Sequence, residues 1–301
     1  MLLQGIRLGK IASEKLGGAQ TLTIVGITSR GCFLQTESAW TIFLTEENTP
    51  GPVTINLPPG AIAAIQPATG QKIGMNNGIL HFSNQVRLCL QAAPIWQPAP
   101  PPAIILPIAT RQESISQAIR LVVDHKAGTG LSGVLPDLIP LLTSCPASGR
   151  ESGPFTEKLT SLIECLQTAE CGRTFLSSRL AAFLGQGSGL TPSGDDFLLG
   201  LFLAWQRWQP VLDAEYLFHP HAHYTGQEAW QKTTSLSASL IECGLNGQAD
   251  QRLISALDGI MTSANQQPQW LNGLLEWGHS SGCDALAGMI LALSPKIKLD
   301  F

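Results

Sequence analysis

The sequence contains little charge, and this scarcity argues against several functions. Only 13% of its 301 residues are Asp, Glu, Lys or Arg, and the formal net charge is −4; soluble domains usually carry about 25% charged residues. No basic run occurs anywhere in the chain, so a nucleic-acid-binding protein is not expected. Low charge instead predicts that part of the surface is uncharged or covered by a partner protein.

Long apolar runs and paired cysteines are also missing. No apolar stretch reaches about 18 residues, the length that a membrane-spanning helix needs, and residues 1–18 lack the apolar core of a signal peptide. The seven cysteines include no Cys-x-x-Cys pair, and an odd, scattered set is typical of reduced thiols. These absences predict a cytoplasmic protein without a membrane-spanning helix.

Residues 20–92 show the pattern of short β-strands. Apolar and polar residues alternate in several short segments that are separated by Pro-Gly breakers. Asn76-Asn77-Gly78 predicts a hairpin turn. We therefore predict a small antiparallel β-barrel or sandwich in residues 1–93, and a stiff proline-rich linker in residues 94–110.

Residues 111–301 show mainly helical periodicity. Several amphipathic segments occur there, and the polar stretch HPHAH at residues 219–223 is predicted to be an exposed loop. The fold class is therefore α+β, with a β-rich domain followed by a mainly α-helical one.

The most informative stretch is GQGSGLTPSGDD, residues 185–196. Its glycines permit positive φ angles, Ser193 is expected to be a helix N-cap, and Asp195 and Asp196 suit the first turn of a helix. The residues that follow, 197–204, are apolar on all sides, which predicts a helix buried in the core.

A second copy of this motif begins at Ser281. SGCDALAGMILA at residues 281–292 matches SGDDFLLGLFLA at residues 193–204, and the offset is 284 − 196 = 88 residues. Gly200 and Gly288 occupy equivalent positions without a side chain, so the two helices are predicted to cross closely. Their N-termini would then face one pocket.

The carboxylates of the two copies are the leading catalytic candidates: Asp195, Asp196 and Asp284. Helix N-termini favour the ionised form of a carboxyl group, so these groups are expected to bind a cation or to accept hydrogen bonds from an NH₂ group. The neighbouring N–H and hydroxyl groups form a candidate anion site. The substrate-binding candidates are Gly187, Gly189, Thr191, Ser193, Gly194, Ser281, Gly282, Thr233 and Thr234. The alternative is that these residues only cap two helices.

Other candidates are weaker. Thr233 and Thr234 follow Lys232 and either bind an anion with it or cap a helix. His219, His221 and His223 alternate, but no cysteine or carboxylate lies nearby at ligand spacing, so no metal site is predicted there. A magnesium phosphate complex would fit the motif residues, and the sequence leaves the need for Mg²⁺ open.

At GLTPSGDDFLLG the sequence resembles the AllH-like family. PVTINLPPG, NNGILHF and SSGCDALAG extend the similarity through most of the chain. The resemblance implies a subunit of an oxamate carbamoyltransferase, which converts oxalurate and phosphate into oxamate and carbamoyl phosphate during allantoin breakdown. It also implies two partners, an FdrA-like protein and a third protein. Some family members have been called carboxylases, and this chain lacks the Ser-Thr-Arg-Thr-Arg motif of ordinary transcarbamoylases.

Three functions follow from the motif and the resemblance. The first is a carbamoyltransferase subunit that binds a small anionic substrate, carbamoyl phosphate or an oxamate-like compound. The second is a non-catalytic scaffold that docks the FdrA-like partner. The third is a stand-alone Mg²⁺-dependent enzyme of acyl or phosphoryl transfer.

Overall fold

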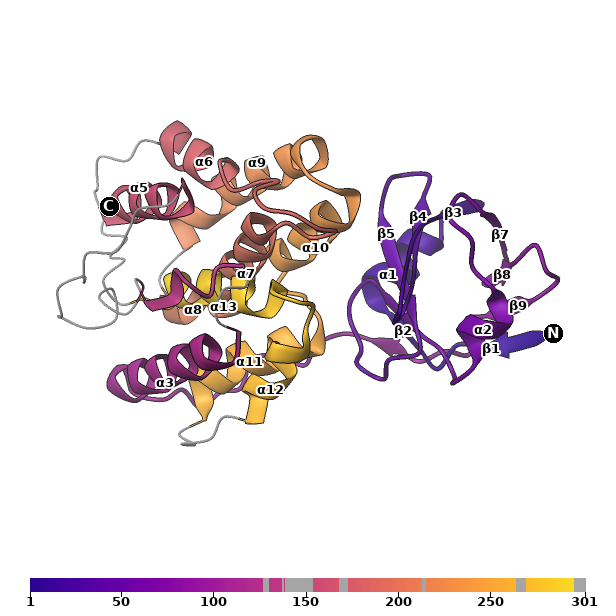
Figure 1. Cartoon of the computed structure of the whole chain (residues 1–301), viewed down its shortest axis with the longest axis horizontal. Coiled ribbons are helices and arrows are strands. Elements are labelled where there is room, and N and C mark those ends of the chain that lie inside the picture. The colour runs from indigo at the N-terminus through magenta and orange to yellow at the C-terminus, as the bar shows by residue number, and fades with distance from the viewer. Residues whose placement is uncertain are drawn as a thin grey trace. The chain divides into compact units, whose positions relative to one another are not determined.

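A computed structural model describes residues 1–126, 130–136, 138, 154–167, 173–212, 215–263 and 269–294. The chain divides into two compact units, residues 1–99 with 249–251 and residues 100–248 with 252–301. The first unit is built on a β-sheet and the second on helices (Figure 1). The predicted α+β class is therefore confirmed.

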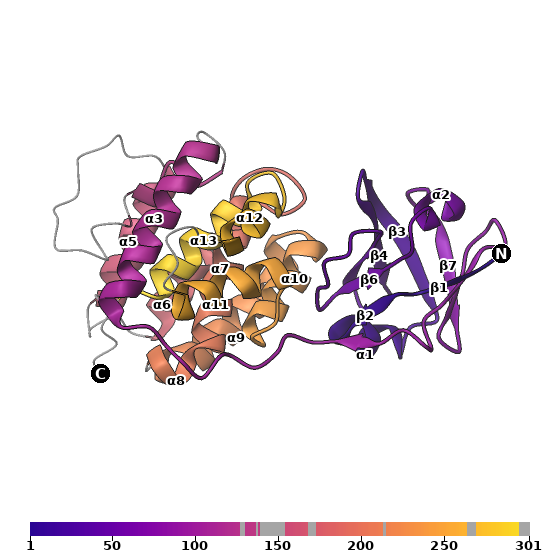
Figure 2. The same ribbon diagram turned by 90° about the horizontal axis from the view of Figure 1, so that it is seen from below.

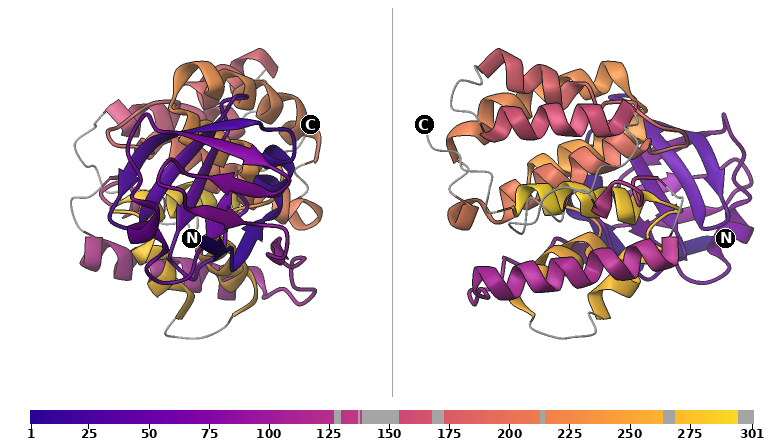
Figure 3. Two further views of the ribbon diagram at one scale, coloured as in Figure 1. Left: turned by 90° about the vertical axis from the view of Figure 1, so that its right-hand side faces the viewer. Right: turned by 60° about the vertical axis from the view of Figure 1, so that its left-hand side comes forward.

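The first unit is one ten-stranded sheet that curls into a half-barrel (Figure 3, left). Its strand order is β1-β9-β8-β7-β3-β4-β5-β6-β2-β10. The strands are β1 (Leu2–Gln4), β2 (Arg7–Gly9), β3 (Thr21–Thr28), β4 (Gly31–Thr36), β5 (Thr41–Thr45), β6 (Thr54–Asn56), β7 (Lys72–Asn76), β8 (Ile79–His81), β9 (Arg87–Cys89) and β10 (Ile95–Trp96). Most pairs are antiparallel, but β1 with β9, β2 with β10 and β5 with β6 are parallel, which the expectation of an antiparallel sheet did not include.

Strand alternation explains the core of this unit. Ile24, Leu34, Ile42 and Ile55 point inward and are fully buried, as the period of two requires. The predicted hairpin turn joins β7 to β8, and Asn77 and Gly78 have φ values of 46° and 71°. Both central residues are thus in the left-handed region that a tight hairpin needs.

Some elements of this unit were not predicted. Two short helices, α1 (Lys10–Leu16) and α2 (Ala61–Ile65), place apolar side chains in the core of the sheet. Strand β10 lies inside the stretch expected to be a linker, where it pairs only with β2 at the edge of the sheet. Proline-rich sequence is compatible with an edge strand because one side of such a strand needs no hydrogen-bond partner.

The second unit contains the two motif helices at its centre. Its helices are α3 (Ile108–Lys126), α5 (Pro154–Gln167), α6 (Arg173–Ala181), α7 (Ser193–Arg207), α8 (Gln209–Leu212), α9 (Glu215–Lys232), α10 (Ser235–Leu245), α11 (Gln251–Thr262), α12 (Gln269–Glu276) and α13 (Ser281–Ala292). Helix α13 packs against α7 more extensively than any other two elements pack together, and both views show them side by side (Figures 1 and 2). Gly194 to Trp205 of α7 are all buried, which confirms the predicted core helix.

Two expectations about this unit were wrong. Residues 219–223 belong to helix α9 rather than to a loop, and His221 is buried in it. Cys165 is disulfide-bonded, so the expectation of seven reduced thiols fails at that position. None of the described helices combines the length and the apolar content needed to cross a membrane.

Candidate functional site

The two motif helices meet at their glycines. A Cβ atom at Gly200 would overlap the carbonyl oxygen of Ala285, and a Cβ atom at Gly288 would overlap the carbonyl oxygen of Phe197. Phe197 follows Asp196, and Ala285 follows Asp284, so each glycine lies against the equivalent point of the other helix. This reciprocity is the mark of a two-fold relation between the copies, and it confirms the predicted close crossing.

The same reciprocity holds at the helix N-termini. The Ser193 hydroxyl hydrogen-bonds to the Asp284 carboxylate, and the Ser281 hydroxyl hydrogen-bonds to the Asp196 carboxylate. Thr191 also hydrogen-bonds to Asp196, and its hydroxyl oxygen lies 3.1 Å from that of Ser281. The serine of each motif copy therefore serves the aspartate of the other copy. The structure thus brings together five residues that the sequence had singled out.

Burial dominates the electrostatics of these carboxyl groups. Asp196 and Asp284 are 1% and 0% exposed, and one oxygen of each, Oδ2, has no hydrogen-bond partner. Burial raises the pKa of Asp196 well above its usual range, and the charges of Asp284 and Asp195 raise it further. Burial also raises the pKa of Asp195 and of Asp284. Position at a helix N-terminus should lower the pKa of a carboxyl group, but the shift is upward at all three aspartates, with burial as its largest cause.

The first turns of both helices are satisfied internally. The N–H groups of Gly194 and Gly282 donate to the carbonyl oxygens of Gln186 and Trp277, over 2.8 Å and 3.0 Å. Both glycines also lie in backbone contact with a preceding segment, where a Cβ atom would overlap a carbonyl oxygen. These two residues therefore fix the packing of the motif and do not present free donors.

Ser193 is not the N-cap that the sequence predicted. Helix α7 begins at Ser193, Pro192 occupies the N-cap position, and no side chain caps the helix. The N–H groups of Asp195 and Asp196 both donate to the Pro192 carbonyl. The Ser193 hydroxyl is thereby released for its hydrogen bond to Asp284.

Asp195 belongs to a second cluster. Its Oδ1 accepts a hydrogen bond from the Gly185 N–H at 2.8 Å, and its Oδ2 accepts one from the Thr233 hydroxyl. Thr234 is the N-cap of α10 and donates to the Leu190 carbonyl at 2.8 Å. Asp195, Thr233 and Thr234 thus fasten both ends of the glycine-rich loop instead of joining the pair of Asp196 and Asp284.

The glycine-rich loop, residues 185–191, is the exposed part of the site. Gly185, Gly187 and Gly189 have φ values of 70°, 116° and 100°, conformations that only glycine adopts without strain. Residues 186–190 are exposed, and the N–H groups of 187–191 find no backbone acceptor in the described part of the chain. The free donors of the candidate anion site therefore lie in this loop.

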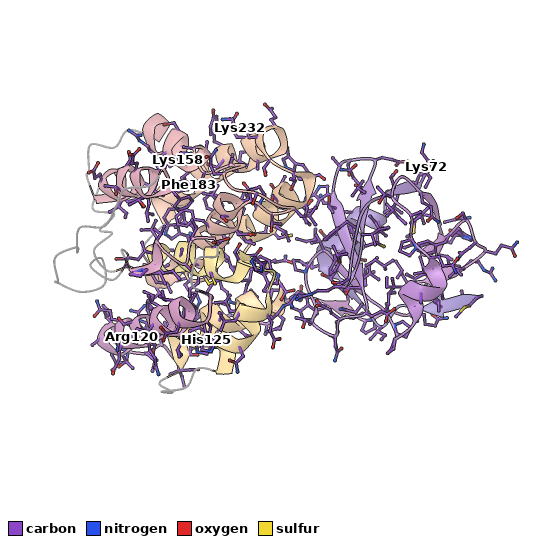
Figure 4. The ribbon with its side chains drawn as sticks, in the orientation of Figure 1. Lys72, Arg120, His125, Lys158, Phe183 and Lys232 are labelled. Carbon is purple, nitrogen blue, oxygen red and sulfur yellow. The ribbon has the colours of Figure 1, made fainter. Side chains whose placement is uncertain are left out.

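A lysine that the sequence did not single out lies beside this loop. Lys158 of α5 donates from Nζ to the side-chain oxygen of Gln186 at 2.6 Å. Figure 4 labels it next to Phe183, whose ring stacks on that of Phe197 with centroids 4.7 Å apart. Because Gln186 is neutral, the charge of Lys158 is available to an anion. The amphipathic pattern of α5 gave no signal for this contact.

A second segment missed in the sequence lies against Asp284. The Leu131 N–H donates to Asp284 Oδ1 at 2.6 Å. Gly130, with φ of 50°, lies so close that a Cβ atom there would overlap the Asp284 carboxylate. A sequence signal existed, because GTGLS at residues 128–132 repeats the pattern of GSGLT at residues 187–191.

The remaining candidates lie elsewhere. Ser177 and His221 hydrogen-bond to each other over 2.7 Å, the His219 side chain lies outside the described residues, and His223 is exposed. Lys232 pairs with Glu228 at 2.5 Å. In the described part of the chain, no group of three or more His, Cys, Asp or Glu residues could hold a metal ion.

The motif residues do not line the cavity at the other ends of the same helices. That cavity, of about 220 Å³, is lined by Arg111, Trp205 and Leu293 among others. Because that cavity does not reach the carboxylates, we expect a ligand to approach them past the half-buried side chains of Thr191, Ser193 and Ser281.

Comparison with known proteins finds one family whose model matches the part of the chain that carries both copies of the motif. The model of the family described as oxamate carbamoyltransferase subunit AllH matches residues 183–293. The matched segment begins just before the glycine-rich loop and ends just after α13, so it contains both copies of the motif. No solved structure matches the chain.

Proposed function

We propose, from the match of residues 183–293 to the family of oxamate carbamoyltransferase subunits AllH, that this chain binds the small anionic substrate of a carbamoyl-transfer complex. The substrate class is carbamoyl phosphate or an oxamate-like acid. The site is formed by the glycine-rich loop and by the two reciprocal N-termini of α7 and α13. An FdrA-like protein and a third protein are the expected partners.

The observation that carries this proposal is the reciprocal pairing of Ser193 with Asp284 and of Ser281 with Asp196. Ordinary helix capping satisfies each helix end from its own residues. Here the polar side chains cross between two helices and remain buried, although each carboxylate keeps an oxygen without a partner. Native proteins rarely leave buried polar atoms unsatisfied unless a ligand or a functional need accounts for them.

The donors of the site match a carbamoyl compound. The exposed N–H groups of 187–191 and the ammonium group of Lys158 suit a phosphate or carboxylate end. The free oxygens of Asp196 and Asp284 suit an NH₂ end or a cation, since a carboxylate oxygen accepts hydrogen bonds and also binds metal ions. Carbamoyl transfer at such a site would depend on positioning and on electrostatic stabilisation of the developing charge.

Asp195, Thr233, Thr234, Gly194 and Gly282 have a positioning role in this proposal. The first three hold the loop at both of its ends, and the two glycines let the backbone of each motif approach the segment before it. Their substitution is expected to act through the loop or the fold.

The test is calorimetric titration of the purified chain with carbamoyl phosphate and with oxamate, each with and without Mg²⁺. We expect binding that weakens by about tenfold in Lys158→Met, because one charged contact to the anion is lost. We expect no detectable binding in the isosteric double variant Asp196→Asn/Asp284→Asn. Glu228→Gln, which removes a carboxylate of α9 that pairs with Lys232, is the matched control.

Two results would contradict the proposal. One is unchanged ligand binding in a double variant that is folded by circular dichroism. The other is a reconstituted complex whose carbamoyl transfer is insensitive to both aspartates, which would leave the scaffold function. Transfer activity of the isolated chain would instead support the stand-alone enzyme.

A further inference from the structure

The proposed function places an anion beside two carboxylates, and this arrangement needs a neutralising charge. Asp196 and Asp284 are almost completely buried, and the ion pairs of the described residues involve neither of them. Their Oδ2 atoms have no hydrogen-bond partner. A buried, unpaired charge is costly unless a proton or a cation compensates it.

The groups around these two oxygens are those that a hard cation prefers. Hydroxyl groups of Thr191, Ser193, Ser280 and Ser281 hydrogen-bond to the two carboxylates. Mg²⁺ binds oxygen ligands and is often held by only one or two carboxylates, together with water and substrate phosphate. Two aspartates are therefore sufficient, even though the described residues offer no group of three or more His, Cys, Asp or Glu side chains.

We propose that the Oδ2 atoms of Asp196 and Asp284 bind one divalent cation of the Mg²⁺ class, and that this cation receives the anionic end of the substrate. The substrate in this statement rests on the proposed function. The cation site itself rests on the two unpartnered oxygens, which are contributed by equivalent positions of two crossing helices.

The alternative to a bound cation is one proton shared by the two carboxyl groups. The two explanations differ in the net charge that they leave at the site. One proton between the carboxyl groups would satisfy both Oδ2 atoms but leave a net charge of −1, which repels an anionic substrate. A divalent cation balances both carboxylates and still attracts the oxygens of a phosphate.

The experiment is titration of the purified, chelator-treated chain with Mn²⁺, followed by electron paramagnetic resonance of the free ion, without substrate or partners. We expect one Mn²⁺ per chain, displaced by excess Mg²⁺. Asp196→Asn and Asp284→Asn should each weaken binding by about tenfold or more, since half of the ligand charge is removed. Glu228→Gln should bind as the unmodified chain does.

Absence of saturable Mn²⁺ binding would overturn the cation site, as would unchanged binding in both asparagine variants. If those variants do not fold, Ser281→Ala keeps both carboxylates and should still weaken Mn²⁺ binding measurably; unchanged affinity there would overturn the site. Mn²⁺ binding without carbamoyl phosphate binding would retain the cation site and reject the proposed function. Carbamoyl phosphate binding without Mn²⁺ binding would reject the cation site and retain the proposed function.

Discussion

In the α7 copy of the motif the residue before the shared aspartate is Asp195, whereas in the α13 copy it is Cys283. Asp195 accepts hydrogen bonds from Gly185 and Thr233, while Cys283 is a buried thiol. The segment that turns into the helix also differs. Gly194 bonds back to Gln186, 194 − 186 = 8 residues away, and Gly282 bonds back to Trp277, only 282 − 277 = 5 residues away.

The comparison divides the motif into features that both copies share and features that only the α7 copy has. The features that both copies share (the serine, the aspartate and the two glycines) build the helix crossing and the carboxylate pair. Two features occur only in the α7 copy: a longer loop, which presents exposed N–H groups, and Asp195, which holds one end of that loop. In the proposed function the α7 copy therefore supplies the exposed donors, and the α13 copy contributes the second carboxylate of the pair.

The largest effect should come from the shared glycines. Gly200→Ala and Gly288→Ala would each drive a methyl group into a carbonyl oxygen of the other helix. Overpacking at a rigid backbone contact should lower the free energy of unfolding by about 3 kcal/mol. Urea unfolding monitored by circular dichroism measures it. If the two-fold relation holds, the two variants should lose similar amounts.

Gly133→Ala is the matched control, because nothing lies within 4 Å of a Cβ atom at that exposed turn of the same unit. Its stability should change little. A Gly200→Ala variant as stable as this control would contradict the close crossing.

The next largest effect should differ between the two copies of the motif, at the equivalent positions Asp195 and Cys283. Asp195→Ala leaves the Gly185 N–H and the Thr233 hydroxyl without their acceptor, and should cost about 2 kcal/mol of unfolding free energy. Cys283→Ala removes one buried sulfur atom and should cost about 1 kcal/mol. Limited proteolysis should also show faster cleavage within residues 186–190 in Asp195→Ala alone, because that loop loses one of its attachments.

Equal proteolysis of the two variants would show that Asp195 does not hold the loop. Glu242→Gln on α10 controls for the loss of a carboxylate, and its cleavage pattern should match that of the unmodified chain.

Local pattern predicted much of this molecule, and tertiary packing decided what it did not. The alternation of residues 21–57, the Asn77-Gly78 turn and the apolar run 197–204 are local signals, and the structure follows them. The crossing of Gly200 with Gly288 was predictable because one motif occurs twice. The helix through His221 was not, since its polar composition resembles a loop until Ser177 provides a buried partner.

The sequence predicted which residues form the candidate site, but it did not predict which of them contact one another. Sequence identified Asp196, Asp284, Ser193 and Ser281, yet each serine was assigned to its own helix. Only the crossing of α7 and α13 pairs each serine with the other copy. The upward direction of the aspartate pKa shifts was missed for a related reason, because helix position can be read from the sequence and depth of burial cannot. Lys158 approaches from a distant helix, and no sequence pattern associates it with the motif. Leu131 is different, because the GTGLS pattern at residues 128–132 was a signal that the prediction overlooked.

The pH dependence of stability should distinguish Asp196 from Asp284. Both carboxyl groups have a pKa above the ordinary 3.8, and that of Asp196 is raised well above it. In the cation-free chain the folded state therefore keeps its protons to higher pH than the unfolded state does. Their contribution is fully present below pH 3.8 and is lost as pH rises through the folded pKa values, with a slope of up to about 1.4 kcal/mol per pH unit for one proton.

Urea unfolding between pH 4 and 8 in the presence of a chelator measures this slope. Asp196→Asn should flatten it more than Asp284→Asn does, and Glu228→Gln should leave it unchanged. A stability that rises over the whole range, with both asparagine variants parallel to the unmodified chain, would contradict the raised pKa values.

The smallest effect, and the most specific, is the coupling between individual side chains of the two copies. Double-mutant cycles that combine Ser193→Ala with Asp284→Asn, and Ser281→Ala with Asp196→Asn, should each show a coupling energy of about 1 kcal/mol. The combinations within one copy should show coupling near zero, since Ser193 and Ser281 cap neither helix. Of the two cross pairs, Ser193 with Asp284 should be the weaker, because Asp284 retains the Leu131 N–H at 2.6 Å when the serine is lost. Coupling only between the serine and the aspartate of the same copy would mean that each serine bonds within its own helix. The two carboxylates would then not form a paired site for a ligand.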